Sequence, residues 1–218
     1  MSPTGPETPS ERFDARLERP TSGEMLREQI LSSERTNVLH ALDSIGGDPA
    51  VLAAAVAIVG ARRRTIVGVG RSYLHAQLFA HSLRASLRGV SVLGTDFEES
   101  VNVLSEVGTD DAVVAFSFRR YRAHTIRVAE MAQRAGATVV AITDAADSPI
   151  TQFAETVIVV PTGSGSHLDS PIGITLVGHV LATLATARAK GARRRLGSRE
   201  ALENELLDYT AHVVHKVS

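Results

Sequence analysis

The stretch T-I-V-G-V-G-R-S, residues 65–72, constrains the fold of this chain more than any other. Its first half, rich in Val and Ile, is typical of a buried β-strand. Gly68 and Gly70 then allow a tight turn, and a helical pattern follows over residues 73–87. A helix that begins behind a glycine turn presents free N–H groups and the positive end of its dipole to an anion. We therefore predict an anion site, usually a phosphate site, above Ser72.

The rest of the sequence repeats this unit, because short apolar runs alternate with amphipathic helical patterns. The predicted strands are residues 65–70, 90–93, 112–118, 138–143 and 156–160. The predicted helices between and after them are residues 73–87, 98–104, 122–135 and 172–189. Such alternation produces a parallel sheet with helices on both faces. The predicted fold class is therefore α/β, a three-layer α/β/α sandwich of Rossmann-like or flavodoxin-like type with a five-stranded parallel sheet.

Composition shifts divide the chain into segments around this sheet. The first residues are rich in Pro, Thr, Glu and Arg and are expected to be disordered. Two helical patterns follow, the first capped by Ser22 and ended by the glycine pair at 46–47. The predicted segments are a disordered N-terminus (1–22), linker helices (23–61), the α/β domain (62–190), and a basic linker, 191–197, with a C-terminal helix (191–218 together). We expect the flanking helices to serve oligomer contacts.

Composition also limits the classes of function. The formal net charge of −1 disfavours nucleic-acid binding through bulk charge. The chain has no cysteine, which excludes disulfides, a thiol nucleophile and a Cys-ligated metal. No apolar run has membrane-spanning length and the N-terminus has no signal core, so the expectation is a cytoplasmic protein without membrane contact. The scarcity of lysine beside arginine suggests a GC-rich bacterial genome.

A second polar loop, F-S-F-R-R-Y-R at residues 116–122, follows the third predicted strand. Ligands of parallel sheets bind beyond the carboxyl ends of the strands, so this loop should face the first one. Arg119, Arg120 and Arg122 bring cations to a helix N-terminus, which costs stability unless an anion or acidic neighbour compensates them. Arginine binds phosphate or carboxylate through paired hydrogen bonds. We predict that Ser117 and these arginines bind an anionic ligand, with a solvated basic loop as the alternative.

These motifs and their order resemble the sugar isomerase (SIS) domain, most closely the effector-binding half of bacterial regulators of the ribose-phosphate-isomerase-repressor type. The resemblance covers about residues 33–209. SIS domains carry G-x-G-x-S in the first loop, matched by Gly68, Gly70 and Ser72, and S-x-S-G-x-T in the second, whose first serine matches Ser117. The resemblance implies a pocket for a phosphorylated or acidic sugar, usually within a homodimer or homotetramer.

In the pocket that the resemblance implies, Gly70, Arg71 and Ser72 would hold one end of the ligand through backbone N–H groups and a hydroxyl. The second motif departs from the family, because Arg119, Arg120 and Arg122 stand where SIS domains have Ser, Gly and Thr. Guanidinium groups replace hydroxyls there, which is also compatible with a carboxylate-bearing or bulkier ligand.

The regulators that the chain resembles begin with a helix-turn-helix domain. Only about forty residues precede Pro49 here, so we expect a stand-alone SIS domain that retains the linker helix and does not bind DNA directly. The favoured function is a regulator-like sensor of a phosphosugar. A third reading is a docking partner of a DNA-binding protein, which would need an exposed apolar stripe on residues 25–45.

Whether the protein is an enzyme stays open, with a phosphosugar isomerase as the second reading. Aldose–ketose isomerisation needs a base and an acid, yet no acid lies between residues 72 and 89. Glu99 is the candidate base and His167 or His179 the candidate acid. Glu99 and His167 are also candidates for hydroxyl contacts in a sensor, while Glu99 equally fits an acidic helix start and His179 a packed residue. His75 fits a surface position.

No cofactor is expected. The first loop lacks the third glycine of a dinucleotide-binding fingerprint, and no acid ends the second predicted strand. No pair of histidines is spaced four residues apart on one helix with a carboxylate nearby, so no metal site is expected.

Overall fold

The computed structural model describes residues 22–217 and five positions nearer the N-terminus (8, 10, 11, 13 and 14), with side chains described as far as Leu207. The N-terminal segment predicted to be disordered therefore lies almost entirely outside the described residues.

Five parallel strands form one sheet in the order β2-β1-β3-β4-β5. They are β1 (Arg64–Gly68), β2 (Val90–Leu93), β3 (Ala112–Ser117), β4 (Thr138–Thr143) and β5 (Thr156–Val159). Strand β1 is an interior strand, because Ile66 lies opposite Val92 on one side and Val114 on the other. The predicted α/β fold with a five-stranded parallel sheet is confirmed, in the flavodoxin-like strand order.

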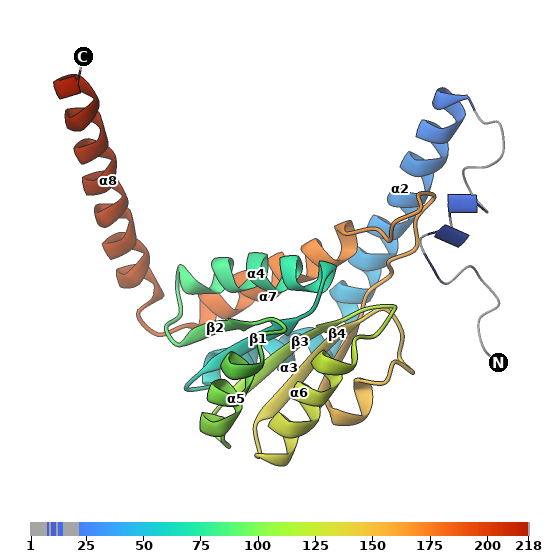
Figure 1. Cartoon of the computed structure of the whole chain (residues 1–218), viewed down its shortest axis with the longest axis horizontal. Coiled ribbons are helices and arrows are strands. Elements are labelled where there is room, and N and C mark those ends of the chain that lie inside the picture. The colour runs from blue at the N-terminus through green and yellow to red at the C-terminus, as the bar shows by residue number, and fades with distance from the viewer. Residues whose placement is uncertain (1–7, 9, 12, 15–21, 218) are drawn as a thin grey trace.

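Helices cover both faces of the sheet (Figure 1). One face packs against α3 (Pro49–Gly60), α4 (Arg71–Arg84) and α7 (Ile172–Arg188). The other packs against α5 (Phe97–Glu106) and α6 (Ala123–Arg134), and the short helix η1 (Thr151–Phe153) follows β4. Side chains alternate between the two cores: those of Val114 and Phe116 enter the first, and those of Val113 and Ala115 the second. Burial on both faces explains why the strands are apolar at most positions.

The helix after the first strand begins earlier than predicted. Gly70 has φ +64° and forms the N-cap, so Arg71 and Ser72 belong to the first turn of α4. The close return of the chain also requires Gly68, because a Cβ there would lie 2.6 Å from the carbonyl oxygen of Ser72. Arg71 and Ser72, which were predicted to lie in the loop, thus stand at the N-terminus of α4.

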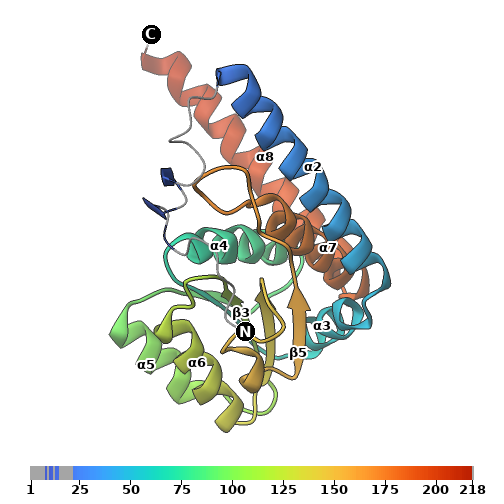
Figure 2. The ribbon, with the colours of Figure 1, turned by 90° about the vertical axis from the view of Figure 1, so that its right-hand side faces the viewer.

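Two long helices project away from the sheet. Helix α2 (Gly23–Gly47) and helix α8 (Ala192–Val217) extend from opposite ends of the molecule on the side of α4 and α7 (Figure 1). Seen after a quarter turn, both still point away from the sheet in the same general direction (Figure 2). Helix α2 is capped as predicted, because Ser22 Oγ accepts a hydrogen bond from the Met25 N–H at 3.2 Å.

The predicted basic linker at 191–197 is wrong, because α8 is helical from Ala192 onward. Residues 189–191 make the turn from α7 into α8, and Gly191 has φ +73° there. The guanidinium of Arg195 donates to the carbonyls of Ser86 and Lys190, which follow α4 and α7. The arginine therefore stabilises a junction between three helices instead of lying in a solvated linker.

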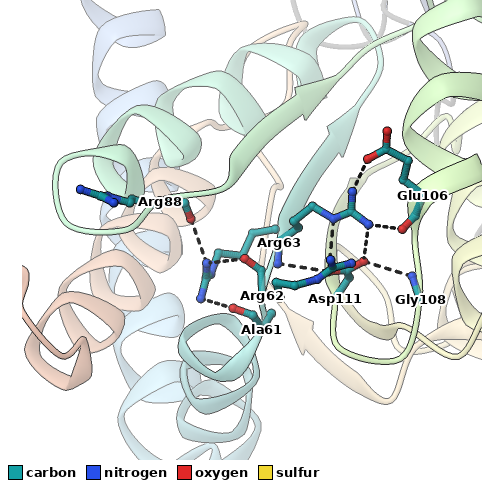
Figure 3. Close-up of polar contacts among 8 residues, drawn as sticks. Ala61, Arg62, Arg63, Arg88, Glu106, Gly108 and Asp111 are labelled. Atoms are coloured by element: carbon teal, nitrogen blue, oxygen red, sulfur yellow. Dashed lines mark hydrogen bonds and ion pairs between the residues drawn. The ribbon is translucent and has the colours of Figure 1, made fainter.

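Polar networks hold the amino-terminal edge of the sheet, opposite the predicted site (Figure 3). Asp111 is 3% exposed and accepts hydrogen bonds from the Gly108 N–H (3.1 Å) and from the backbone and guanidinium of Arg63 (both 3.2 Å). The buried guanidinium of Arg64 donates instead to backbone carbonyls, including those of Val59 and Arg88 (2.8 and 2.9 Å). These networks satisfy groups that burial would otherwise leave without partners.

Within the described part of the chain, no single helix is long and apolar enough to cross a bilayer, although α2 with α3 and α7 with α8 pass that test as bent pairs.

Candidate anion-binding site

A cavity of about 130 Å³ opens at the carboxyl ends of β1 and β3, and we call it the arginine cavity. Five of the seven predicted ligand-binding residues line it: Arg71, Ser72, Arg119, Arg120 and Arg122. Gly70 caps the helix that carries the first two, and Ser117 ends β3 beneath the others. The remaining walls come from the β5–α7 loop and from the start of α7. The structure thus brings the two predicted loops together.

The cavity is strongly positive. The guanidinium of Arg71 donates to the backbone carbonyl of Asp169 at 3.0 Å. No ion pair joins Arg119, Arg120 or Arg122 to any carboxylate of a described residue. Glu98 and Glu99, the acidic residues in the first turn of α5, are not among the residues that line the cavity, whereas Asp169 is. Within the described part of the chain, the three arginines therefore have no ion-pair partner, and Asp169 is the acidic residue in the cavity lining.

Helix dipoles add to this positive charge. Helix α4 begins at Arg71 and α6 follows Arg122, and neither helix has a side-chain cap. In contrast, α2, α3 and α5 are capped by Ser22, Asp48 and Asp96. Helices α4 and α6 thus begin at the cavity without a side-chain cap, and the cations at their N-termini, Arg71 and Arg122, oppose the dipole. Free N–H groups, dipoles and guanidiniums together favour an anion.

Buried polar atoms lie under the second loop. The hydroxyls of Ser117 and Thr125, and Oδ1 of Asp144, are buried without a hydrogen-bond partner among the described residues. The other oxygen of Asp144 accepts from the Arg119 N–H at 3.3 Å. Burial, with the charge and hydrogen bond of Asp144, raises the pKa of Tyr121 to about 12 despite the opposing charge of Arg119. Tyr121 therefore stays a neutral hydrogen-bonding group. Sequence reasoning missed Asp144, although its place directly after a strand was a usable signal.

His75 lines the arginine cavity from the second turn of α4, where a surface position had been expected. Burial, and secondarily the charge of Arg71, lowers the pKa of His75 below its ordinary value. The imidazole is therefore neutral near pH 7 and offers one donor and one acceptor. Its spacing from Ser72 places it one helical turn behind the loop, a signal that was available in the sequence.

The candidate catalytic residues lie elsewhere. Glu99, whose N–H donates to Asp96 Oδ1 at 2.7 Å, lines a separate open groove that meets the arginine cavity only at Val69. The ring of His167 packs edge-on against Phe13, with centroids 6.3 Å apart, and does not line the cavity. His179 is exposed on α7 and lines a second cavity. The structure does not bring these three side chains together with the arginines.

The linker helix α2 holds the third wall of the site. The carboxylate of Glu34 accepts hydrogen bonds from the hydroxyls of Ser164 (3.0 Å) and Ser170. Ser33 Oγ accepts from the Gly165 N–H at 2.9 Å, and Asn37 donates to a neighbouring carbonyl of the same loop. These contacts join residues more than 120 positions apart, so no local pattern reveals them. No group of three potential metal ligands is assembled by the described residues.

Comparison with known proteins agrees with this architecture. The family model of the SIS domain matches residues 57–187, which is more than half of the chain. This chain belongs to the SIS domain family. The match begins in α3 and ends in α7, so it includes the sheet and both loops of the arginine cavity. A search of curated proteins finds no match.

Solved structures similar to this SIS domain include domains of regulators and proteins bound to sugar phosphates. The sugar isomerase domain of an RpiR transcription factor from Sphaerobacter thermophilus is 26% identical, with a TM-score of 0.75 over 81% of this chain and 98% of that one. Vibrio vulnificus NanR complexed with ManNAc-6P is 18% identical, with a TM-score of 0.67 over 91% and 74%. A protein of Escherichia coli CFT073 in complex with a phosphosugar is 18% identical, with a TM-score of 0.61 over 76% and 93%. The last two likenesses concern the fold alone.

Proposed function

We propose that this SIS domain binds a phosphorylated sugar, or a similar anionic sugar derivative, in the arginine cavity and acts as a regulator-like sensor. One observation carries the proposal: Arg119, Arg120 and Arg122, unpaired among the described residues, meet two uncapped helix N-termini at one cavity. Such an arrangement is costly without an anion and favourable with one. The sugar phosphates held by NanR and by the Escherichia coli protein support the choice of ligand class.

The placement of acids favours a sensor over an enzyme. An isomerase needs a base within reach of the substrate carbons, and Glu99 lines a separate groove. Solved structures with this fold include a putative phosphosugar isomerase from Bacteroides fragilis, at 15% identity, so isomerisation remains the second proposal. Proton NMR of each bound sugar phosphate tests it: conversion to the ketose or aldose, lost in Glu99→Gln, would support catalysis.

The proposal includes assembly into a homodimer or homotetramer and a cytoplasmic location, both carried forward from the sequence. Exposed apolar residues on α2, including Leu31 (62% exposed) and Leu39 (54%), support the assembly.

Thermal-shift screening against sugar phosphates, sugar acids and free sugars tests the binding proposal. A ligand at one hundred times its Kd should raise Tm by about 5–10 °C through mass action. We expect the shift with a phosphorylated or acidic sugar and its loss in Arg119→Ala and Arg122→Ala. Arg127→Ala is the matched control, because Arg127 lies on the exposed side of α6 and pairs with Glu130. No shift with any anionic sugar would refute the proposal.

A further inference from the structure

A second cavity of about 150 Å³ lies between α4 and α7, directly beside the arginine cavity. The two cavities share His75 and Ile174 as lining residues. Phe79 and Phe116, each at most 2% exposed, line the second cavity and pack edge to face with centroids 5.8 Å apart. The second cavity thus adjoins the first at His75 and reaches the buried aromatic pair, while the exposed residues Leu78, Thr175 and His179 form its outer side.

The hydroxyl groups around the second cavity are already used within their own helices. Ser82 Oγ donates to the Leu78 carbonyl at 3.1 Å, and Thr175 Oγ1 donates to the Pro171 carbonyl at 2.9 Å. The side-chain polar groups left for a ligand are therefore the imidazoles of two histidines. One of them, His75, stands at the entrance from the arginine cavity and is neutral near pH 7 because burial and Arg71 lower its pKa. The second cavity therefore suits an apolar substituent that carries one polar group at its point of attachment, next to His75.

Gly178 keeps the second cavity open. This glycine lies inside α7, where an L-residue would fit the helix, and it is one of the lining residues. A Cβ built at Gly178 would lie 3.7 Å from Cδ2 of Phe79, in ordinary contact, so a larger side chain would extend into the space beside that ring. Filling the cavity from this position, or from Ser82 at its rim, is therefore a direct way to test its use.

We propose that the second cavity is a subsite for a short acylamino substituent, so that the ligand is the phosphate of an N-acylated amino sugar. This inference rests on the proposed function, because the arginines must hold the anionic group. The methyl of an acetyl group would contact the aromatic rings, and the amide would hydrogen-bond with His75. An amino sugar without the acyl group would place a free ammonium group beside the arginines and remove it from water, which is unfavourable. A sugar with a hydroxyl group at that position would leave the apolar walls of the second cavity exposed to water.

Calorimetric titration of the full chain with two matched series tests the inference. One series is glucose 6-phosphate, glucosamine 6-phosphate and N-acetylglucosamine 6-phosphate, and the other is the corresponding mannose series. We expect the N-acetyl compound to bind at least about ten-fold tighter than both relatives in one series, the effect of a small group in a fitted apolar pocket. Equal affinities in both series, with sugar phosphates bound, would overturn the subsite but leave the proposed function. Binding by no compound would overturn both.

Two cavity-filling variants locate the effect. Ser82→Phe and Gly178→Val should each abolish the preference for the N-acetyl compound and change the affinity for the parent sugar phosphate by less than about two-fold. His81→Phe, on the exposed side of the same helix, is the control and should keep the preference. A preference that survives both fillings, or an equal loss for acylated and parent compounds, would overturn the assignment. Ser82→Phe still decides the question if Gly178→Val does not fold.

Discussion

At the scale of single residues, the molecule places two kinds of charge at opposite edges of its sheet. At the amino-terminal edge, Asp111 is buried and fully engaged with Arg63, Arg62 and the Gly108 N–H. At the carboxyl edge, Arg119, Arg120 and Arg122 line a cavity and form no ion pair with a carboxylate of a described residue. A satisfied charge network favours stability, and an unsatisfied one favours ligand binding at the expense of stability.

Asp111 should make stability depend on pH in the acid range. Burial alone would raise its pKa, but hydrogen bonds from Arg63 and Gly108 and the charges of Arg63 and Arg62 outweigh burial, so the pKa of Asp111 is lowered. A lowered folded-state pKa adds stability above the unfolded value of about 3.9, and this contribution disappears as the pH falls through the folded value. We expect Asp111→Asn to cost about 1–3 kcal/mol at pH 7, and the difference from the parent to shrink below about pH 4.

Urea unfolding of parent and variant at pH 7, 5, 4 and 3 measures this difference. Asp110→Asn is the neighbouring control, since Asp110 is exposed. A difference that stays constant down to pH 3 would contradict the assigned role of the carboxylate.

At the scale of elements, the cations at the beginnings of α4 and α6 cost helix stability, and a bound anion would offset that cost. Arg122 occupies the N-cap of α6 with φ −80° and ψ 123°, a backbone conformation that suits a capping serine. We expect Arg122→Ser to stabilise the ligand-free protein by about 1 kcal/mol, because it removes a cation from the dipole and adds a cap. The same change should abolish the thermal shift caused by a sugar phosphate.

Urea unfolding without ligand tests this prediction, with Arg127→Ser as the control inside the same helix. A variant less stable than the parent would mean that the Arg122 guanidinium is held by the protein itself, against the anion-site proposal.

The contact between α2 and the β5–α7 loop gives the linker helix a role in the site. Glu34 accepts hydrogen bonds from Ser164 and Ser170. These two serines lie on either side of Leu168 and Asp169, which line the arginine cavity. Removing this carboxylate should leave the global fold intact but free the loop. We expect Glu34→Ala to speed amide hydrogen exchange over residues 163–170 by about ten-fold, and Glu28→Ala, at an exposed position of α2, to leave it unchanged. Unchanged exchange in Glu34→Ala would show that the loop is ordered without α2.

At the scale of the whole molecule, α2 carries apolar side chains that the described residues leave exposed. Met25, Leu31, Leu39 and Leu42 are all at least half exposed, at helical spacing. This stripe is what the docking-partner reading required of residues 25–45, and a second copy of the chain would cover it equally well. The proposed assembly into a homodimer or homotetramer would bring a second copy of the chain onto this stripe. We therefore expect a dimer or tetramer in solution.

Light scattering of the purified chain tests this expectation. Leu31→Glu combined with Leu42→Glu should reduce the mass to that of a monomer, because charges would enter the apolar interface. Phe97→Glu is the matched control, as Phe97 is 73% exposed on α5, far along the chain from α2. A monomeric parent would contradict self-association and favour a different protein as the occupant of the stripe.

The sequence by itself determined the layered α/β architecture and the two loops of the site. Strands 90–93 and 138–143 were predicted to the residue, because apolar runs bounded by glycine turns are local signals. The meeting of the two loops at one cavity was equally predictable, because the carboxyl ends of neighbouring parallel strands lie at the same edge of a sheet.

Only the tertiary structure decided which side chains share a cavity. Glu99 follows the correct strand but lines a neighbouring groove, whereas His75 and the distant Ile174 meet at the junction of two cavities. The 191–197 segment is helical despite its basic composition, and Arg195 in it donates to carbonyls that directly follow two other helices, α4 and α7. Contacts of this kind depend on side-chain direction and on the packing of elements far apart in sequence, and periodicity along the chain carries neither.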